Sequence, residues 1–233
     1  MIKIKVADII VGIENRHRHI EWLCREYLSD GEPEFTVRAE DRDIERERAM
    51  SEAEFSEGYL ESVVIYRKIA EELYRYDGFV FHGAVLNYEG RAYAVTARSG
   101  VGKTTHTRLW LEAFGDRVHY LNGDKPIIRI IDGKPIAYGT PWMGKESYGR
   151  NESAELCGIA FLERGERNVA TPADLDSSVM KLISQIYMPK SADGASRTMS
   201  LADELLSLVK LVDLKCNMDI EAAYTLYGAF AEA

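Results

Sequence analysis

The spacing of apolar residues predicts a small sheet at the beginning of the chain. Residues 2–14 alternate between apolar and polar positions, as a half-buried strand does. A second strand, FTVRAE, is expected from Phe35, after a break that contains a glycine and a proline. The run AEDRDIERERAMSEAE that follows mixes charges of both signs, which is typical of the solvent-facing side of a helix. These segments indicate a small N-terminal sheet beside a charged helix face.

A longer helix is expected to join this sheet to the rest of the chain. Ser51 and Glu54 match a capping box, and apolar residues then recur at helical spacing as far as Tyr76. This pattern predicts a helix over about residues 53–76. We therefore expect residues 1–76 to form a small α+β region.

Strands dominate the chain from Phe79 onward. FVFHGAVLNYEGRAYAVTA predicts two apolar strands around an NYEG turn, followed by a helix that ends near Gly115. PIIRIIDGKPIAYGT predicts a hairpin with a type I′ turn at its Asp-Gly pair, and AELCGIAFLER predicts a buried strand. Two amphipathic helices and a last helix follow. Because strands outnumber helices without strict alternation, we expect residues 77–233 to form an α/β domain, a mixed sheet with flanking helices.

Composition narrows the class of protein. The chain has 233 residues, 46% of them hydrophobic, which is enough to bury a proper core. Its net charge of -9 argues against a nucleic-acid or membrane-surface partner, because both require a positive face. Three scattered cysteines without metal-ligand spacing fit buried thiols in a reducing compartment. The N-terminal apolar run is too short for a signal peptide, and no later run approaches the ~20 residues of a membrane span, so we expect a cytoplasmic protein.

The most informative stretch is TARSGVGKTTHT at residues 96–107. An apolar strand precedes it and a helix follows, and it matches the phosphate-binding loop (P-loop) pattern G-x-x-x-x-G-K-[ST] except at Ala97, which replaces the first glycine. Alanine is acceptable there if its φ stays below zero. Such a loop points backbone N–H groups at an anion, at a helix N-terminus. The residues expected to bind a nucleotide are Ser99, Gly100, Val101, Gly102, Lys103, Thr104 and Thr105.

A magnesium site is expected beside this loop. In P-loop proteins the lysine, here Lys103, reaches the β and γ phosphates, and the following hydroxyl, here Thr104, binds Mg²⁺. Asp124 closes the apolar segment VHYL and is the candidate carboxylate for the same metal; the alternative is an ordinary turn aspartate. The guanine-specifying order Asn-Lys-x-Asp is absent, so a GTPase is not expected.

The segment FHGAVLNYEGRAYAVTARSGVGKTTHT, together with HYLNGD, resembles the core of the HPr kinase/phosphorylase family. The resemblance covers roughly residues 79–130, and SGVGKTT is also similar to the ATP-dependent phosphoenolpyruvate carboxykinases, which share the nucleotide fold. It implies a P-loop fold like that of the HPr kinase C-terminal domain, and Mg²⁺-dependent transfer of the γ-phosphoryl group of ATP to a hydroxyl. It also implies that His82 lies near the γ-phosphate and that Asp124 is the second aspartate of the family's Asp-Asp pair. From the residues alone, a lone histidine in an apolar strand such as FVFHGAV is most often a buried core residue, and this remains the alternative for His82.

Two departures from the family pattern bear on the chemistry. Gly123 stands where the family has its first aspartate, the residue thought to accept the hydroxyl proton. Either Asp124 both binds the metal and accepts the hydroxyl proton, or His82 or Glu146 is the base. The family's downstream Glu-Ile-Arg-Gly-like signature is not matched either, which leaves both HPr as substrate and the phosphorylase reaction open.

The segment YGTPWMGKESYGRNE takes the place of that signature. Its glycines allow close backbone approach, and Lys145 and Arg150 are expected to bind an anionic substrate or the transferring phosphoryl group. Trp142 is expected to offer a stacking face for the substrate. The alternative is a surface loop with a packing tryptophan.

The leading hypothesis is an ATP- and Mg²⁺-dependent kinase acting on a hydroxyl of a small molecule or of a peptide or protein serine. The alternative is a nucleotide-binding regulatory protein with little or no transfer activity, which Gly123 and Ala97 favour. A carboxykinase-type decarboxylase is disfavoured because the chain is short for that family. The sequence leaves open the acceptor, the preference for ATP over GTP or pyrophosphate, and the oligomeric state, with residues 1–76 expected either to cap the nucleotide domain or to mediate dimerisation.

Overall fold

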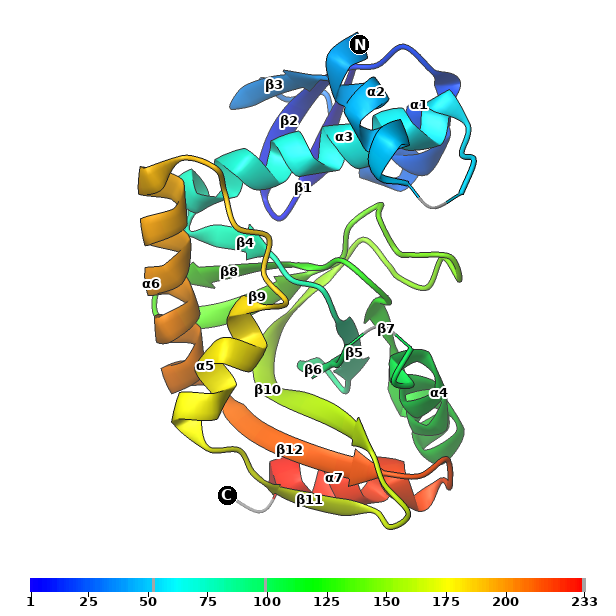
Figure 1. Cartoon of the computed structure of the whole chain (residues 1–233), viewed down its shortest axis with the longest axis vertical. Coiled ribbons are helices and arrows are strands. Elements are labelled where there is room, and N and C mark those ends of the chain that lie inside the picture. Colours follow the sequence, from blue (N-terminus) through cyan, green and yellow to red (C-terminus); the bar gives the residue numbers. More distant parts are fainter. Residues whose placement is uncertain (52, 99, 232–233) are drawn as a thin grey trace.

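The N-terminal part of the chain forms a three-stranded sheet covered by helices. The computed structural model describes residues 1–51, 53–98 and 100–231 (Figure 1). Strands β1 (Ile2–Val6) and β2 (Ile9–Glu14) form an antiparallel hairpin, and β3 (Phe35–Arg38) pairs in parallel with β2. The strands expected over residues 2–14 and from Phe35 are therefore confirmed. A short helix, α1 (Arg18–Leu23), which the apolar pattern did not predict, and a 3₁₀ turn at Arg25–Tyr27 connect them.

Two helices, rather than one, connect this sheet to the rest of the chain. The charged run forms α2 (Asp41–Met50), and α3 (Glu57–Glu72) follows and ends in a 3₁₀ turn at Leu73–Tyr76. The predicted start of the long helix is wrong. Ser51 is the residue at which α2 ends, and Ser56 caps α3 by accepting a hydrogen bond from the backbone N–H of Tyr59 at 3.3 Å. Both serines are competent caps, and the charged run uses its own Glu40–Asp43 capping box to form a separate helix.

The rest of the chain is built on one curled, mixed sheet (Figure 1). Its main path runs β4-β8-β9-β10-β6-β5-β7, and β12 joins it by pairing with β10 and β11. The long strand β10 is antiparallel to β9 and parallel to β6 and β12, so the sheet is mixed. The strands are β4 (Gly78–Val80), β5 (Ala84–Tyr88), β6 (Arg91–Thr96), β7 (Val118–Asn122), β8 (Ile127–Ile131), β9 (Lys134–Tyr138), β10 (Ser153–Arg164), β11 (Val169–Pro172) and β12 (Lys210–Cys216). The β8–β9 turn carries the predicted Asp-Gly pair, with φ of 50° and 73°.

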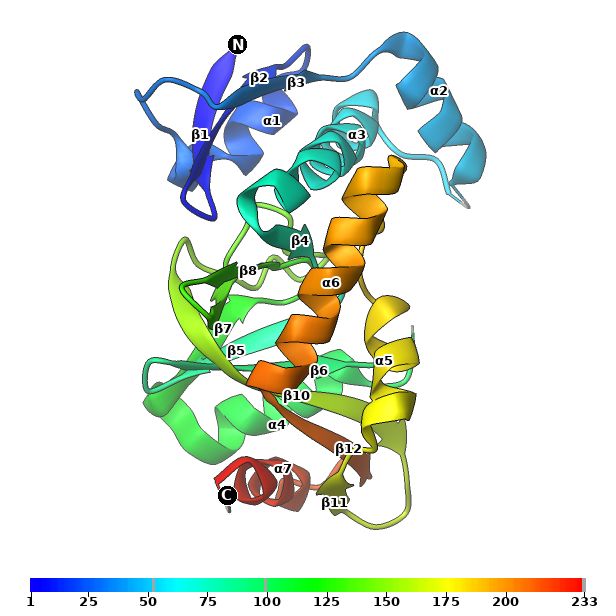
Figure 2. The ribbon, with the colours of Figure 1, turned by 90° about the vertical axis from the view of Figure 1, so that its left-hand side faces the viewer.

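Helices cover both faces of this sheet (Figures 1 and 2). Leu182, Leu201 and Leu205 of the helices on one face share a core with strand residues, and Trp110 and Leu226 belong to the core on the other face. The helices are α5 (Leu175–Ile183) and α6 (Ala192–Leu208) on the first face, and α4 (Lys103–Phe114) and α7 (Glu221–Ala231) on the second. The expected α/β class, a mixed sheet with flanking helices, is confirmed.

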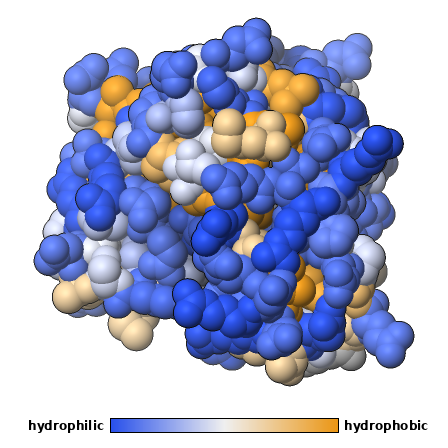
Figure 3. All heavy atoms as spheres, turned by 90° about the horizontal axis from the view of Figure 1, so that it is seen from above, coloured by the Kyte–Doolittle hydropathy of each residue, from blue (hydrophilic) through white to orange (hydrophobic). Residues whose placement is uncertain are grey.

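The N-terminal region packs onto the large sheet through a core of its own. This core joins the small sheet and α3 to Val80, Ile127 and Trp142 of the following region. The face that the N-terminal region presents, seen from above in Figure 3, is largely hydrophilic, and hydrophilic side chains separate its apolar areas. No helix of the described chain is long and apolar enough to cross a membrane. Cys24 and Cys216 are buried as expected, whereas Cys157 is only partly buried.

Strand direction brings distant segments to one edge of the large sheet. Strand β5 is antiparallel to both β6 and β7, so β6 and β7 run in the same direction and end at the same edge, where β5 begins. The register places Val95 opposite Ala84, and Asn122 opposite Val85. Strand β10, parallel to β6, ends there too. We call this edge the P-loop edge; it consists of residues 81–83, 97–98, 100–103, 122–126 and Arg164.

Candidate functional site

The predicted P-loop has the backbone of an anion-binding turn at the start of a helix. Gly100 and Gly102 have φ of 78° and 130°, values that side chains rarely adopt, and the next residue, Lys103, begins α4. Ala97 is buried, and it is not among the residues with positive φ, so alanine is tolerated at the first glycine position. Ser99 lies outside the described residues. The loop can therefore point N–H groups at an anion on the helix N-terminus.

Lys103 is held against the loop in a partly buried position. Its Nζ donates a hydrogen bond to the carbonyl oxygen of Ala97 at 3.1 Å. Burial lowers the pKa of Lys103; the negative charge of Asp124 opposes that shift, and the positive charge of Lys125 adds to it. In the described part of the chain, no carboxylate forms an ion pair with Lys103. A half-buried ammonium group without a paired carboxylate is a natural contact for an anion.

Thr104 and Thr105 occupy the first turn of α4 and are both exposed. Val101 is partly buried, and its backbone N–H donates to the carbonyl oxygen of Arg98 at 3.3 Å, closing the turn. Both threonine hydroxyls are therefore available at the helix start, where the sequence predicted ligand contacts.

A fixed turn follows β7 and carries Asp124. Asn122, which is fully buried, accepts hydrogen bonds through its Oδ1 from the backbone N–H groups of Asp124 at 2.9 Å and Lys125 at 2.8 Å. Its Nδ2 donates to the Oγ1 of Thr140 at 3.0 Å. Asn122 has no role among the sequence-based predictions, although asparagine is a known turn signal because its side chain bonds to the backbone two residues on. Asn122 is thus the residue that orients Asp124.

His82 and Asp124 face each other at this edge. His82 Nε2 lies 3.5 Å from Asp124 Oδ1, and the ammonium group of Lys125 pairs with the other carboxylate oxygen. The His82 side chain is 43% exposed, so it is not the buried core histidine of the alternative interpretation. Burial would raise the pKa of Asp124, but the interaction with His82 and the charge of Lys125 outweigh burial and hold that pKa well below its usual range. The carboxylate is therefore ionised at neutral pH.

The segment over residues 139–150 packs closely on Gly123. The N–H of Gly123 donates to the carbonyl oxygen of Tyr148 at 2.8 Å. A Cβ at position 123 would lie 3.2 Å from that oxygen and 3.3 Å from the carbonyl oxygen of Met143. A side chain at position 123 would therefore require this backbone to shift by a few tenths of an ångström.

This segment contacts the P-loop helix as well as the turn after β7. Arg108 of α4 pairs with Glu146 Oε2 at 3.2 Å and donates to the hydroxyl of Tyr148 at 3.3 Å. Among the described residues, Glu146 makes no hydrogen bond or ion pair with His82 or Asp124. Of the three candidate bases, His82 and Asp124 lie together and Glu146 is engaged elsewhere.

The other predicted residues of this segment take different positions. Trp142 is buried, its ring stacks on that of Tyr66 at a centroid distance of 4.2 Å, and its Nε1 donates to the carbonyl oxygen of Ser62 at 2.9 Å. The expectation of a free stacking face is therefore wrong, because α3 covers this ring. Lys145 and Arg150 are exposed, and within the described residues neither forms a hydrogen bond or ion pair with Lys103, His82 or Asp124.

Arg164, at the end of β10, is a contact that sequence reasoning missed. Its Nη2 donates to the carbonyl oxygen of Gly100 at 2.6 Å, and its Nε donates to that of Val101 at 3.0 Å. These bonds brace the P-loop from the neighbouring strand. Only strand order places Arg164 here, and no local pattern signals it.

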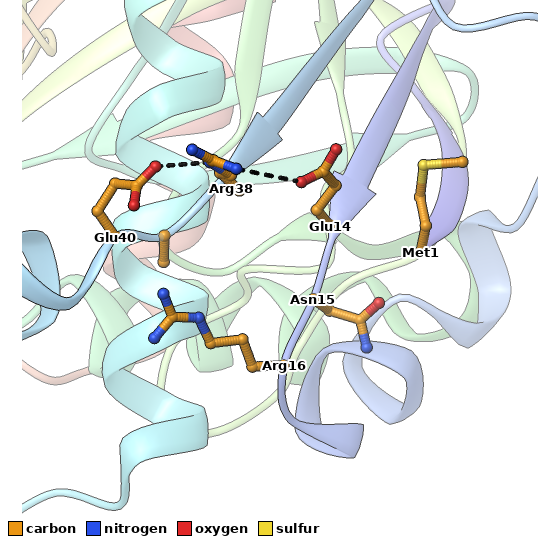
Figure 4. Close-up of a pocket in the computed structure, with 7 residues that line it drawn as sticks. Met1, Glu14, Asn15, Arg16, Arg38 and Glu40 are labelled. Atoms are coloured by element: carbon orange, nitrogen blue, oxygen red, sulfur yellow. Dashed lines mark hydrogen bonds and ion pairs between the residues drawn. The ribbon is translucent and has the colours of Figure 1, made fainter.

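Two surface hollows lie away from this edge. One, of about 380 Å³, is in the N-terminal region, where Arg38 lies between Glu14 and Glu40 (Figure 4). The other, of about 340 Å³, lies between that region and β9–β10 and includes Asp8 and Tyr138. None of their lining residues is a predicted phosphate, metal or substrate ligand, so they contribute nothing to this site.

The donor set at the P-loop edge suits a metal bound mainly by phosphate oxygens. Within residues 1–51, 53–98 and 100–231, no group of three or more His, Cys, Asp or Glu side chains could hold a metal on its own. Mg²⁺ bound to a nucleotide needs only one or two protein oxygens, the remainder coming from phosphates and water. One ionised carboxylate, Asp124, and one exposed hydroxyl, Thr104, meet that requirement.

Comparisons with known proteins give a distant structural likeness. No protein-family model matches the chain, and no curated protein matches it. Among solved structures, the Hpr(Ser) kinase/phosphatase from Coxiella burnetii is similar, with a TM-score of 0.30 and 10% sequence identity over 54% of this chain and 95% of that one. Such a likeness is remote, so the functional argument rests on the geometry of the P-loop edge.

Proposed function

We propose that this protein is an ATP- and Mg²⁺-dependent kinase that transfers the γ-phosphoryl group to a hydroxyl. The observation that carries the proposal is the meeting of three segments at one sheet edge. They are the P-loop with Lys103, the residues before β5 with His82, and the turn after β7 with Asp124. These groups supply an anion cradle, a proton acceptor and an ionised oxygen ligand, which are the parts that phosphoryl transfer needs.

The phosphate side of the mechanism uses the loop and its helix. The N–H groups of the P-loop and the Lys103 ammonium would hold the β and γ phosphates. Thr104 and Asp124 would hold Mg²⁺, which when bound neutralises charge on the phosphate oxygens. The low pKa of Asp124 suits this role, because the carboxylate stays ionised at any pH where the enzyme would work.

The acceptor side of the mechanism assigns the base to His82. The acceptor oxygen attacks the γ-phosphorus, the bond from phosphorus to the ADP oxygen breaks, and the hydroxyl proton passes to the imidazole and then to water. An imidazole exchanges protons near neutral pH, whereas the lowered pKa of Asp124 makes that carboxylate a weak base. Asp124, 3.5 Å from His82 Nε2, would orient the ring. The transition state is loose, so one imidazole in place of the family's aspartate is sufficient.

The first test is calorimetric titration with a non-hydrolysable ATP analogue, with and without Mg²⁺. We expect the wild type to bind in a Mg²⁺-dependent manner and Lys103→Ala to weaken binding at least tenfold, about 1.4 kcal/mol, without unfolding. Lys134→Ala, an exposed lysine at the start of β9, is the matched control. Absence of binding by the wild type would refute the proposal, and loss of the fold in Lys103→Ala would refute the phosphate role of that lysine.

One observation favours a second candidate, a nucleotide-binding regulatory protein with little or no transfer. Gly123 stands where the family that the sequence resembles has its first aspartate, and it packs closely on the backbone of residues 139–150, so the site has one carboxylate where that family has two. Labelled ATP offered with a broad panel of hydroxyl compounds separates the two functions. Tight binding without transfer to any of them favours the regulator, and labelled product establishes the kinase.

For the phosphoryl acceptor we propose a chemical class, a hydroxyl compound. A hydroxyl of a small molecule and a serine of a peptide or protein both fit the mechanism, and Lys145 or Arg150 would bind an acceptor that carries negative charge. We also infer a cytoplasmic location, since three free thiols fit a reducing compartment. No nucleic-acid or membrane partner is proposed for a chain with a net charge of -9.

A further inference from the structure

Lys125 has an unusually well-fixed backbone for an exposed lysine. Its N–H donates to Asn122 Oδ1 at 2.8 Å. Its carbonyl oxygen accepts hydrogen bonds from the hydroxyl of Tyr66 at 2.6 Å and from the Oγ1 of Thr140 at 2.9 Å. These partners come from β7, from α3 of the N-terminal region and from the segment after β9. The Cα of Lys125 is therefore fixed relative to the whole P-loop edge.

The side chain of Lys125 adds positive charge at the place where the terminal phosphate is expected. Its ammonium group pairs with Asp124, and the side chain as a whole is 46% exposed. Its charge also lowers the pKa of Lys103, and the charge of Asp124 raises that pKa. Two lysines and one aspartate thus interact at this edge of a chain whose net charge is -9.

The ion pair with Asp124 does not by itself explain why position 125 is a lysine. Water screens this pair only in part, because the Lys125 side chain is 46% exposed and that of Asp124 is 23% exposed. The first cause of the low pKa of Asp124 is the hydrogen bond with His82, and the pair with Lys125 comes second. The three hydrogen bonds to the Lys125 backbone would form with almost any residue there. What only the lysine side chain supplies is a cation beside both Asp124 and Lys103.

We propose that Lys125 is a second phosphate-binding cation, which contacts the terminal phosphate of the nucleotide from the side opposite the P-loop. The inference rests on the proposed kinase function and adds a residue that the P-loop pattern does not contain. The ion pair with Asp124 holds the ammonium group in place beside the P-loop. The fixed backbone limits the freedom that the side chain loses on contact with a phosphate. Lys125 therefore distinguishes nucleoside triphosphate from diphosphate.

The test compares two ligands in the presence of Mg²⁺, a non-hydrolysable ATP analogue and ADP. We expect Lys125→Met to weaken binding of the ATP analogue about tenfold more than binding of ADP, because only the analogue carries the terminal phosphate. Lys125→Arg keeps the positive charge and should therefore retain most of the wild-type preference for the ATP analogue over ADP. Lys134→Met, a substitution of the same kind at the exposed start of β9, should leave both affinities unchanged. Each variant should keep its thermal midpoint within about 2 °C of the wild type.

A purely structural role for Lys125 predicts a different result. The methionine variant would then bind both ligands as the wild type does, or lose affinity for both by the same factor, and either outcome overturns the inference. Lys103→Ala in the same series separates this failure from failure of the proposed function. If Lys103→Ala weakens binding of both ligands while Lys125→Met changes the two affinities equally or not at all, only the proposed role of Lys125 is refuted. If the wild type binds neither ligand, both proposals fall. Lys125→Gln replaces the methionine variant should that one not fold.

Discussion

The turn at residues 122–126 is held by side chains from several elements, whereas the P-loop beside it is held chiefly by its own backbone. In the turn, Asn122 and Thr140 are fully buried and hydrogen-bonded, and Tyr66 reaches the turn from α3. In the P-loop, Gly100 and Gly102 have open space where a Cβ would stand. The described contacts that side chains make with that loop's backbone come from Lys103 and Arg164.

This difference fits the two roles proposed for the site, metal binding by the turn and phosphate binding by the P-loop. A carboxylate that holds a metal and orients a histidine must keep its position before any ligand arrives, since errors of about 1 Å cost catalysis heavily. A phosphate cradle made of N–H groups can complete its shape around the anion it binds. Substitutions in the turn should therefore change the free energy of unfolding, and substitutions around the P-loop should change nucleotide affinity.

The largest effect is expected for Asn122→Ala. The change leaves the N–H groups of Asp124 and Lys125 without their acceptor in a partly buried turn, and it removes the buried donor to Thr140. We expect the free energy of unfolding to fall by about 3 kcal/mol, as measured by urea denaturation. Asn151→Ala removes an exposed asparagine that makes a single hydrogen bond to Glu26 and should cost less than about 1 kcal/mol. Equal losses in the two variants would contradict the claim that the turn is fixed by Asn122.

A smaller effect is expected for Tyr66→Phe. The ring can still stack on Trp142, but the hydroxyl bond to the carbonyl oxygen of Lys125 is lost, which should cost about 1 kcal/mol of stability. Tyr59→Phe, on the exposed side of the same helix, is the control and should change stability by less than about 0.5 kcal/mol. Nucleotide affinity should also fall in Tyr66→Phe alone. A variant with wild-type stability and affinity would show that α3 does not support the turn.

The parts of this site that could be predicted from sequence are those that local patterns encode. The P-loop is one continuous motif after an apolar strand, and Asp124 follows the end of another strand, so both were identifiable. The approach of His82 to Asp124 required the register of β5 with β7, which the HPr-kinase resemblance implied only in outline.

The contacts that were missed join residues far apart in the chain. Tyr66 and Lys125 are separated by 59 residues, and Gly100 and Arg164 by 64. Trp142 was misjudged for the same reason: a glycine-rich neighbourhood suggests exposure, but the ring that covers it lies on α3. Strand order and the docking of the N-terminal helix decide these contacts, and neither leaves a periodic signal.

The smallest change in stability, and the sharpest contrast with the turn, is expected for Arg164→Met. Arg164 is exposed, and among the described residues its side chain bonds to the carbonyl oxygens of Gly100 and Val101, which water can satisfy in its absence. The free energy of unfolding should therefore stay within about 0.5 kcal/mol of the wild type. Affinity for the ATP analogue should fall about threefold, or about 0.7 kcal/mol, because the loop loses the brace that limits its conformations before phosphate binds. Arg167→Met, an exposed arginine three residues further on, is the control and should change neither quantity. If Arg164→Met instead cost as much stability as Asn122→Ala, the P-loop would be as dependent on side-chain support as the turn, and the contrast between them would be lost.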